Sequence, residues 1–310
     1  PQAARRVKLR ILLTLLALAF SVPARADFTF ALLGDAPYGG SEETQFSTML
    51  DDINRSDVAF AVHVGDFKNG WTSCGDAVFE QRRALFDSAK HAFIYIPGDN
   101  EWTDCSRLLA GRYDPLERLS ALRKRFFSGA TSLGQTPLKL SRQSDDATAP
   151  FYPEHMRWQH DGVLFVTLNF PGGDNNSGMP QESAERTAAA LAWMRQGFAQ
   201  ARAQKAPGIV VLMQANPFLR SGNPRRGYES LLAALAHETA GYSGQVLLGH
   251  GDTHIHRIDH PLRDGLDAHL AYTWSRSMDD ASAFLASDGN DNTPQDSRTL
   301  AAELNVPTRY

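Results

Sequence analysis

The sequence is poor in cysteine, in excess charge and in long apolar runs. Its 310 residues include only two cysteines, and 31 basic against 35 acidic side chains leave a formal net charge of −4. A slightly acidic net charge gives no indication of nucleic-acid binding, so no nucleic-acid partner is expected. The apolar run at residues 11–22 is too short to cross a bilayer, and no internal repeat or heptad pattern is present. The hydrophobic content of 42% and the charged content of 21% are ordinary for a globular protein.

The N-terminal residues predict an export signal. Residues 5–10 are mostly basic, residues 11–22 are apolar, and an A-x-A cleavage site ends at Ala26. We therefore interpret residues 1–26 as a signal peptide that is removed after Ala26, with a buried N-terminal helix as the alternative. On the first interpretation the mature protein is periplasmic or secreted and keeps no stable membrane span.

Export bears on the two cysteines, Cys74 and Cys105. Exported proteins meet an oxidising environment, in which a pair of cysteines tends to form a disulfide. We predict a Cys74–Cys105 bridge, and two free buried thiols are the alternative. The bridge would tie together the loops that carry Trp71 and Trp102, whose rings either stack on a substrate or pack within the loops.

Short apolar runs alternate with helical patterns along the chain. Each run is continuously apolar, as is typical of strands that are buried on both faces. Strands that alternate with helices predict an α/β fold with helices on both faces of the sheet. The predicted strands are residues 28–33, 58–64, 92–96, 163–168, 209–213 and 246–248, and the predicted helices are residues 41–54, 77–90, 182–204 and 228–239, the first with Ser41 as its N-cap.

The C-terminal part of the chain differs in composition. Residues 282–310 are rich in Asp, Asn, Ser and Pro and show no strand periodicity, which predicts a loosely ordered segment. We therefore divide the chain into a signal peptide at 1–26, one domain at 27–265 and a polar tail at 266–310, to which the sequence assigns no function.

A polar side chain follows nearly every predicted strand. In open α/β sheets, ligands bind beyond the carboxyl ends of the strands. Several carboxylates gathered there repel one another unless a cation lies between them. A single Gly-Asp pair more often caps a turn or a helix, but its repetition at successive strand ends predicts a metal site. The candidate ligands are Asp35, Asp66, Asp99, Gln214, Asp252 and His254.

The order of these motifs resembles that of the calcineurin-like metallophosphoesterases. The resemblance covers about residues 28–260 and is carried by Gly34-Asp35, Gly65-Asp66, Gly98-Asp99-Asn100-Glu101, Gln214 and Gly251-Asp252-Thr253-His254. It implies a two-sheet α/β/β/α sandwich with two divalent metal ions, which hydrolyses phosphate esters with a metal-activated water. It assigns Asp35, Asp66 and His254 to one ion, and Asp66, Asp99, Gln214 and Asp252 to the other.

Oxygen-bearing side chains replace most of the imidazoles in the family pattern. Asp99 and Asn100 stand where its third motif has Asn and His. Gln214 stands for its lone His, and Asp252 for the first His of its last motif, while Pro37 replaces the His of the first. Carboxylate and carbonyl oxygens suit magnesium and manganese, whereas imidazoles suit zinc. We therefore expect manganese or magnesium to be favoured over zinc.

Three residues are candidates for catalysis. Asn100 takes the family's general-acid position, where an amide can hydrogen-bond a phosphate oxygen but cannot protonate a leaving group. His250, like His63, lies just before a metal motif and is a candidate proton donor, with a buried structural histidine as the alternative for each. Lys68 could bind a substrate phosphate as a point charge. Further polar residues expected near the site are Tyr38, His63, Arg220, Arg225 and Arg226.

Two hypotheses about function follow. The first is an exported metal-dependent phosphoesterase that acts on a small phosphorylated substrate. The rival is a catalytically weak protein on the same scaffold, which binds a metal or a phosphoryl ligand without turnover. Asn100 and Pro37 favour the rival, whereas the surviving carboxylates oppose it, because an idle site has no need to hold repelling charges together.

Overall fold

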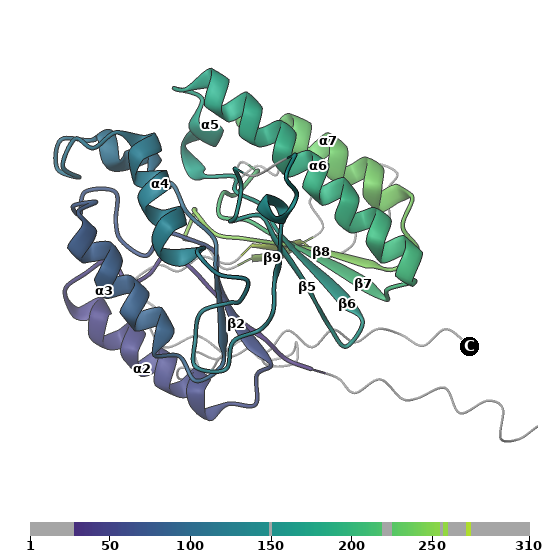
Figure 1. The fold of residues 1–310 in the computed structure, drawn as a ribbon, viewed down its shortest axis with the longest axis horizontal. Helices are drawn as coiled ribbons and strands as arrows, with labels where there is room; N and C mark the ends of the chain where they lie inside the picture. The colour runs from purple at the N-terminus through teal and green to yellow at the C-terminus, as the bar shows by residue number, and fades with distance from the viewer. Residues whose placement is uncertain (1–27, 149–150, 219–224, 255–256, 260–270, 274–310) are drawn as a thin grey trace, which may run out of the picture.

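The computed structural model describes residues 28–148, 151–218, 225–254, 257–259 and 271–273. The predicted signal peptide and Arg220 lie outside these residues, as does most of the predicted tail. Within the described part, the protein is a mixed α/β structure with two β-sheets (Figure 1). No described helix is both long and apolar enough to cross a membrane.

The smaller sheet is built from the N-terminal part of the described chain. Its strands β1 (Ala31–Leu33), β2 (Phe60–His63) and β3 (Ala92–Tyr95) are parallel and lie in that order. The helices α2 (Ser41–Arg55) and α3 (Asp76–Asp87) connect them. Parallel strands joined through helices are buried on both faces, which accounts for the nearly continuous apolar composition of all three.

The larger sheet has its described strands in the order β4-β5-β6-β7-β8-β10-β9. β6, β7, β8 and β10 are parallel to one another, whereas β4, β5 and β9 pair with their neighbours antiparallel. The strands are β4 (Ser141–Arg142), β5 (Met156–His160), β6 (Val163–Thr167), β7 (Gly208–Leu212), β8 (Gln245–His250), β9 (Arg257–Asp259) and β10 (Ala271–Thr273).

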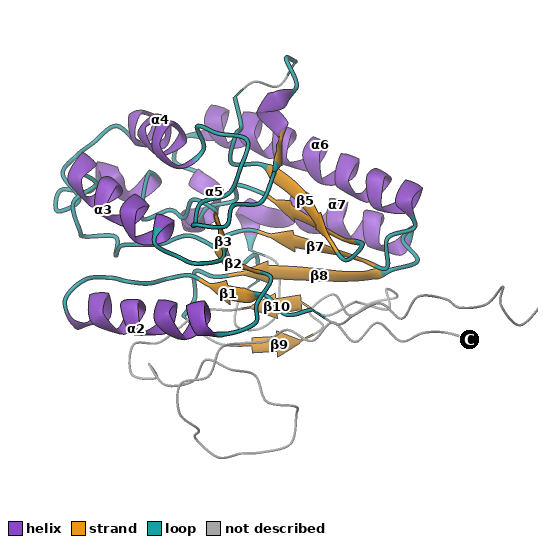
Figure 2. Ribbon diagram, turned by 60° about the horizontal axis from the view of Figure 1, so that its bottom comes forward, coloured by secondary structure: helices purple, strands orange, loops and turns teal. Residues whose placement is uncertain are grey.

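Helices cover the outer sides of the sheets. α6 (Pro180–Gln204) and α7 (Glu229–Ala240) lie along one face of the larger sheet, and α2 and α3 lie beside the smaller sheet (Figures 1 and 2). α4 (Pro115–Phe126) packs against α3. The remaining short elements are η2 (Thr103–Ser106), η3 (Gln143–Asp145), α5 (Gly172–Asn176) and η4 (Arg226–Tyr228).

Aromatic side chains join the two sheets face to face. The ring of Phe165 on β6 lies 5.1 Å from that of Phe60 on β2 and 5.4 Å from that of Phe30. The neighbours of Phe165 on its strand, Leu164 and Val166, face the other way and pack under α6 and α7. Each fully buried side chain of this kind stabilises the fold by about 1.5–3 kcal/mol. The alternation along β6 therefore fills two cores, one between the sheets and one under the helices.

A disulfide joins Cys74 and Cys105, as the sequence predicts, and both cysteines are buried. Trp102 is also fully buried, and the guanidinium of Arg186 lies 5.4 Å from its ring. Trp71 on the other bridged loop is 60% exposed. Trp102 therefore packs within the protein, and of these two rings only that of Trp71 is open to solvent.

The predicted strands are all present, as β1, β2, β3, β6, β7 and β8, and the predicted helices are α2, α3, α6 and α7. The prediction of Ser41 as an N-cap is wrong, because Ser41 is the first helical residue and the N-cap is Gly40, with a φ of 62° and no side-chain cap. α4 and the antiparallel β5 were not predicted. β10 lies between β8 and β9, so the sheet continues past residue 265, where we placed the end of the domain.

Candidate metal centre

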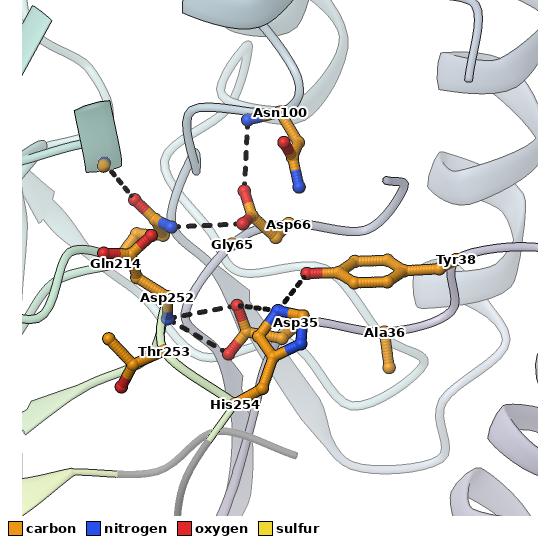
Figure 3. A network of polar contacts seen from close by, with 12 residues as sticks. Asp35, Ala36, Tyr38, Gly65, Asp66, Asn100, Gln214, Asp252, Thr253 and His254 are labelled. Carbon is orange, nitrogen blue, oxygen red and sulfur yellow. Dashed lines mark hydrogen bonds and ion pairs between the residues drawn. The ribbon is translucent and has the colours of Figure 1, made fainter. Parts of the chain in front are cut away.

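Side chains from both sheets meet beyond the carboxyl ends of the parallel strands. Asp35, Asp66 and Asp99 follow β1, β2 and β3 of the smaller sheet. Gln214 and Asp252 follow β7 and β8 of the larger sheet. Figure 3 shows these two sets of loops facing each other in one polar network that also includes His254. The fold therefore brings all the predicted ligands into one cluster.

The backbone at four of these residues is left-handed. The φ angle is 53° at Asp35, 60° at Asp66, 78° at Asp252 and 53° at His254. For residues other than glycine this conformation costs on the order of 1 kcal/mol or more. Such strained residues concentrate at functional sites, where the surrounding fold holds them in place. Their concentration here sets the cluster apart from ordinary turns.

One edge of the cluster is formed by Asp35, His254 and Tyr38. Both carboxylate oxygens of Asp35 accept a hydrogen bond from the backbone N–H of Asp252, at 3.1 and 3.2 Å. Nε2 of His254 lies 3.7 Å from Oδ1 of Asp35 and 2.8 Å from the hydroxyl oxygen of Tyr38 (Figure 3). The His254 side chain is 37% exposed and that of Asp35 only 1%. This edge is therefore the open side of the cluster.

The centre of the cluster is an amide between two carboxylates. Nε2 of Gln214 donates to Oδ2 of Asp66 at 3.2 Å and to Oδ1 of Asp99 at 3.0 Å. Oε1 of Gln214 accepts a hydrogen bond from the backbone N–H of Gly172 at 2.6 Å. A backbone N–H can only donate, so this bond fixes the amide with its oxygen toward Gly172 and its nitrogen toward the carboxylates.

Gly172 presses its backbone directly against the cluster. A Cβ atom at this position would lie 2.7 Å from Oδ1 of Asp99 and 2.8 Å from Oδ1 of Asp252. Oδ1 of Asp99 and Oδ1 of Asp252 therefore flank the same small space, which only a glycine leaves open. The following residues of α5 form a left-handed turn, with φ of 58° at Asn175. Arg186 holds this turn by donating to Oδ1 of Asn175 at 2.6 Å.

Arg225 closes the far side of the cluster. Its Nη1 lies 2.9 Å from Oδ2 of Asp252 and also donates to the backbone oxygen of Asn216 at 3.1 Å. The Arg225 side chain is 21% exposed and the Asp252 side chain 16%. The sequence placed Arg225 near the site as one of several rim arginines, and the structure gives it a carboxylate partner within the predicted ligand set.

Burial and mutual repulsion raise the pKa values of the central carboxyl groups. For Asp35 the largest cause is burial, followed by the charge of Asp252; for Asp66 it is burial, followed by the charge of Asp99. Burial and the charge of Asp252 raise the pKa of Asp99 to about 8. A nearby cation would lower all of these pKa values. Near neutral pH the cluster therefore holds protons or binds a cation.

Glu101 and Lys68 lie next to the cluster on its buried side, and both side chains are fully buried. Oε1 of Glu101 accepts from the backbone N–H of Phe67 at 3.2 Å and from the hydroxyl of Tyr95 at 3.0 Å. Burial lowers the pKa of Lys68, opposed first by the charge of Glu101 and then by that of Asp66. Nζ of Lys68 donates to the backbone oxygen of Asn69 at 3.0 Å. The positive charge of Lys68 thus stabilises the carboxylates from the buried side of the cluster. Its side chain has no exposed surface that could contact a substrate phosphate.

The residues predicted for proton transfer differ in access. Asn100 donates its backbone N–H to Oδ1 of Asp66 at 3.2 Å, and its side chain lies beside that carboxylate (Figure 3). His250 is fully buried, and burial lowers its pKa to about 3. His63 is also fully buried, its Nε2 lies 2.8 Å from the backbone oxygen of Ala36, and burial lowers its pKa to about 4. These two imidazoles therefore support the fold around the cluster.

Several residues of the site could not be identified from the sequence. Gly172 follows a strand and precedes a second glycine, which by itself indicates only a turn. Arg186 lies near the start of a long helix, where an arginine normally faces solvent. Glu101 was matched to the acidic end of the family's third motif, but the sequence assigned it no role in the site.

Among the described residues, no group of three or more His, Cys, Asp or Glu side chains has the arrangement of a ready-made metal site. The hydrogen bonds above give one reason, because the amide nitrogen of Gln214 lies between Asp66 and Asp99. The assignment of the predicted ligands to a metal stays a prediction.

No protein-family model matches the chain, and no curated protein matches it either. The resemblance to the metallophosphoesterases rests on the motifs alone.

Proposed function

We propose that this protein is an exported, metal-dependent phosphoric ester hydrolase with the α/β/β/α sandwich of the calcineurin-like metallophosphoesterases. The observation that carries the proposal is the convergence of the motif residues from both sheets on one cluster with left-handed backbone. Elsewhere in the described chain, the buried carboxylates of Glu154 and Glu238 pair with Arg123 and Arg202. In the candidate cluster, the described cationic side chains are fewer than the carboxylates, so these carboxylates cannot all be paired in the same way.

The charge of the cluster supports a bound cation. Within the described part of the chain, its five carboxylates face two cationic side chains, so the fully ionised cluster carries a net charge of −3. Buried like charges at such density persist only with protons or a metal ion. A divalent ion would reduce the net charge to −1. The carboxylates are those of Asp35, Asp66, Asp99, Glu101 and Asp252, and the cations are Lys68 and Arg225.

The residues at the open edge fit such an ion. Two ligand atoms that are each about 2.1 Å from one metal lie about 3–4 Å apart. Oδ1 of Asp35 and Nε2 of His254 are 3.7 Å apart and meet this condition. Asp66 follows the neighbouring strand, and the charge of Asp35 contributes to its raised pKa after burial and the charges of Asp99 and Glu101. Asp35, His254 and Asp66 would therefore hold the ion.

The reaction would divide between the ion and the chain. A divalent ion at this place supplies Lewis-acid polarisation of a phosphoryl oxygen and a water of lowered pKa. The backbone N–H of Asp252 orients the Asp35 carboxylate. Nε2 of His254 has a single lone pair, so it would exchange its present contact with the Tyr38 hydroxyl for the ion. The Asn100 amide, beside Asp66, can donate a hydrogen bond to a phosphate oxygen. Since an amide donates no proton to the leaving group, esters of acidic alcohols or phenols are the best substrates.

The rival function has an observation in its favour. Both histidines that could have replaced the missing general acid, His63 and His250, are fully buried. Of the imidazoles beside the cluster, His254 alone combines exposure with contact to Asp35 among the described residues. A protein that binds a metal or a small phosphorylated ligand without turnover is consistent with this arrangement.

Hydrolysis assays separate the two functions. The protein is stripped with a chelator, supplied with manganese, magnesium or zinc alone, and assayed with an activated aryl phosphate and with the corresponding diester. We expect turnover with manganese or magnesium that exceeds turnover with zinc, because the ligand set is rich in oxygen. Metal binding by calorimetry without hydrolysis of either ester would support the rival. Tight zinc in the purified protein would contradict the expected metal preference.

A further inference from the structure

The donors expected around a second cation already have partners in this chain. Such a cation would lie among Asp66, Asp99, Asp252 and Gln214. It would need the amide oxygen of Gln214, because an amide nitrogen is a hydrogen-bond donor and has no available lone pair. It would also need carboxylate oxygens free of competing positive charge. The structure does not meet the first condition, and at Asp252 it does not meet the second.

The Gln214 amide fills the space between the carboxylates. Its nitrogen donates to Asp66 and Asp99, at 3.2 and 3.0 Å, with one N–H for each. Reversing the amide would point its NH₂ group at the N–H of Gly172, 2.6 Å from the present oxygen, and would place its oxygen between two carboxylates. Both changes are unfavourable, so the donor orientation is built into the fold. Gln214 is fully buried, which makes an unpaired amide still more costly.

Arg225 supplies the positive charge for the third carboxylate. Its guanidinium contacts Oδ2 of Asp252 at 2.9 Å and is anchored by the backbone oxygen of Asn216. Arginine stays protonated at every physiological pH. The charge of Asp252 is therefore neutralised by an arginine side chain of the protein, which cannot exchange with solvent as a metal ion can.

We propose that the Gln214 amide and the Arg225 guanidinium replace a second metal ion, so that the cluster takes a single divalent cation between Asp35 and His254. This inference rests on the proposed metal-dependent function and assigns its site one ion. The two protein groups supply what a second ion would otherwise supply to Asp66, Asp99 and Asp252. They do so permanently, and a chelator cannot remove them.

Manganese binding to the purified protein tests the stoichiometry. The chelator-treated protein is dialysed against Mn²⁺ alone, bound manganese is counted by elemental analysis, and the bound ion is examined by electron paramagnetic resonance. We expect one Mn²⁺ per chain and the six-line spectrum of an isolated ion. These readouts do not depend on hydrolysis, so they stay informative if no tested ester is a substrate.

A double variant tests the residues that are named. Gln214→His with Arg225→Gln removes both protein donors and restores a nitrogen ligand, and we expect it to bind a second Mn²⁺ at least tenfold more tightly than the unmodified protein. Arg226→Gln is the matched control, because it removes the same charge from an exposed neighbouring position. The control should keep one ion. Circular dichroism confirms that each variant is folded.

The outcomes are distinguishable. Two ions per unmodified chain, with the spectrum of a spin-coupled pair, would overturn the inference and leave the metal-dependent function standing. No bound manganese, magnesium or zinc would overturn the proposed function together with the inference. One ion in the unmodified protein supports the inference even if the double variant does not fold, since the first measurement does not use it.

Discussion

Nε2 of Gln214 donates a hydrogen bond to Oδ2 of Asp66 across a separation of 148 residues and across the junction of the two sheets. Asp66 follows a strand of the smaller sheet and Gln214 a strand of the larger one. The two sheets are therefore connected at the cluster by polar side chains as well as by the aromatic core. A change at either residue acts on the site and on the packing of the sheets together.

Substitution of Asp66 by Asn should abolish metal-dependent hydrolysis and keep the fold. Asp66→Asn removes one of the repelling buried carboxylates, but its NH₂ group would face one of the two donors to Asp66, the Gln214 amide or the Asn100 backbone N–H. Since the two effects oppose each other, we expect a melting temperature close to that of the unmodified protein in the absence of metal. The affinity for Mn²⁺ should fall at least a hundredfold, because the ion loses a charged ligand. Calorimetry and thermal unfolding check the two parts. Near-native turnover by this variant would contradict the proposed site.

Substitution of Gly172 by Ala should disturb the carboxylates of the cluster that contact its backbone. The added Cβ would lie 2.7 Å from Oδ1 of Asp99 and 2.8 Å from Oδ1 of Asp252, and one of them has to move. We expect Gly172→Ala to lower the free energy of unfolding by about 1–3 kcal/mol and to weaken metal binding. Gly178→Ala is the control, since a Cβ there meets no atom within 4 Å. Equal behaviour of the two variants would show that the contact is not tight in solution.

Loss of the disulfide should reduce both stability and ligand affinity. The Cys74–Cys105 bridge closes a loop with a sequence separation of 31, which corresponds to about 3–4 kcal/mol in the chain-entropy model. The bridge holds η2 and the loop with Trp102 next to Asn100. We therefore expect the Cys74→Ser, Cys105→Ser variant to unfold at lower temperature and to bind phosphate more weakly. Unchanged melting and binding would mean that the bridge does not support the site.

The sequence predicted the parallel framework because its strands are short apolar runs between amphipathic helices. β5 was missed because it is antiparallel and less uniformly buried, with Gln159 exposed. α4 was missed although Asp114 caps it and Pro115 begins it, which are both helix-start signals. The pair Asp114-Pro115 therefore predicts the start of α4 from the sequence alone.

The ligand candidates were predictable because strand ends of parallel sheets converge. The roles of Gln214 and Arg225 were not, since they depend on which atom of an amide faces a carboxylate and on how a loop folds back. His250 and Lys68 were predicted from their positions beside motifs, but burial is set by the layers packed around them. A sequence pattern therefore predicts where in the fold a side chain lies more readily than how exposed to solvent it is.

Acid should destabilise the protein through Glu154, a buried carboxylate away from the predicted ligands. Burial alone would raise its pKa, but the charge and hydrogen bonds of Arg123 outweigh burial and, with smaller contributions from His155 and Asn169, lower the pKa to about 2. A carboxyl group whose pKa is lower in the folded than in the unfolded state stabilises the fold above the unfolded pKa. This stabilisation is lost as the pH falls from about 4.5 toward 2.

The Glu154→Gln variant isolates this contribution. A difference of about 2.5 pKa units corresponds to roughly 3 kcal/mol, so the unmodified protein should lose about this much more stability between pH 5 and pH 2 than the variant does. At pH 7 the variant should be the less stable protein, because Arg123 loses its charged partner. His63 also takes up a proton in acid, but it does so in both proteins and cancels in the difference. His155 does not cancel fully, because the charge of Glu154 raises its pKa against the larger effect of burial, and the variant lacks that charge. Urea unfolding of both proteins at a series of pH values measures this difference in stability. Parallel curves of stability against pH would show that Glu154 does not titrate with a lowered pKa.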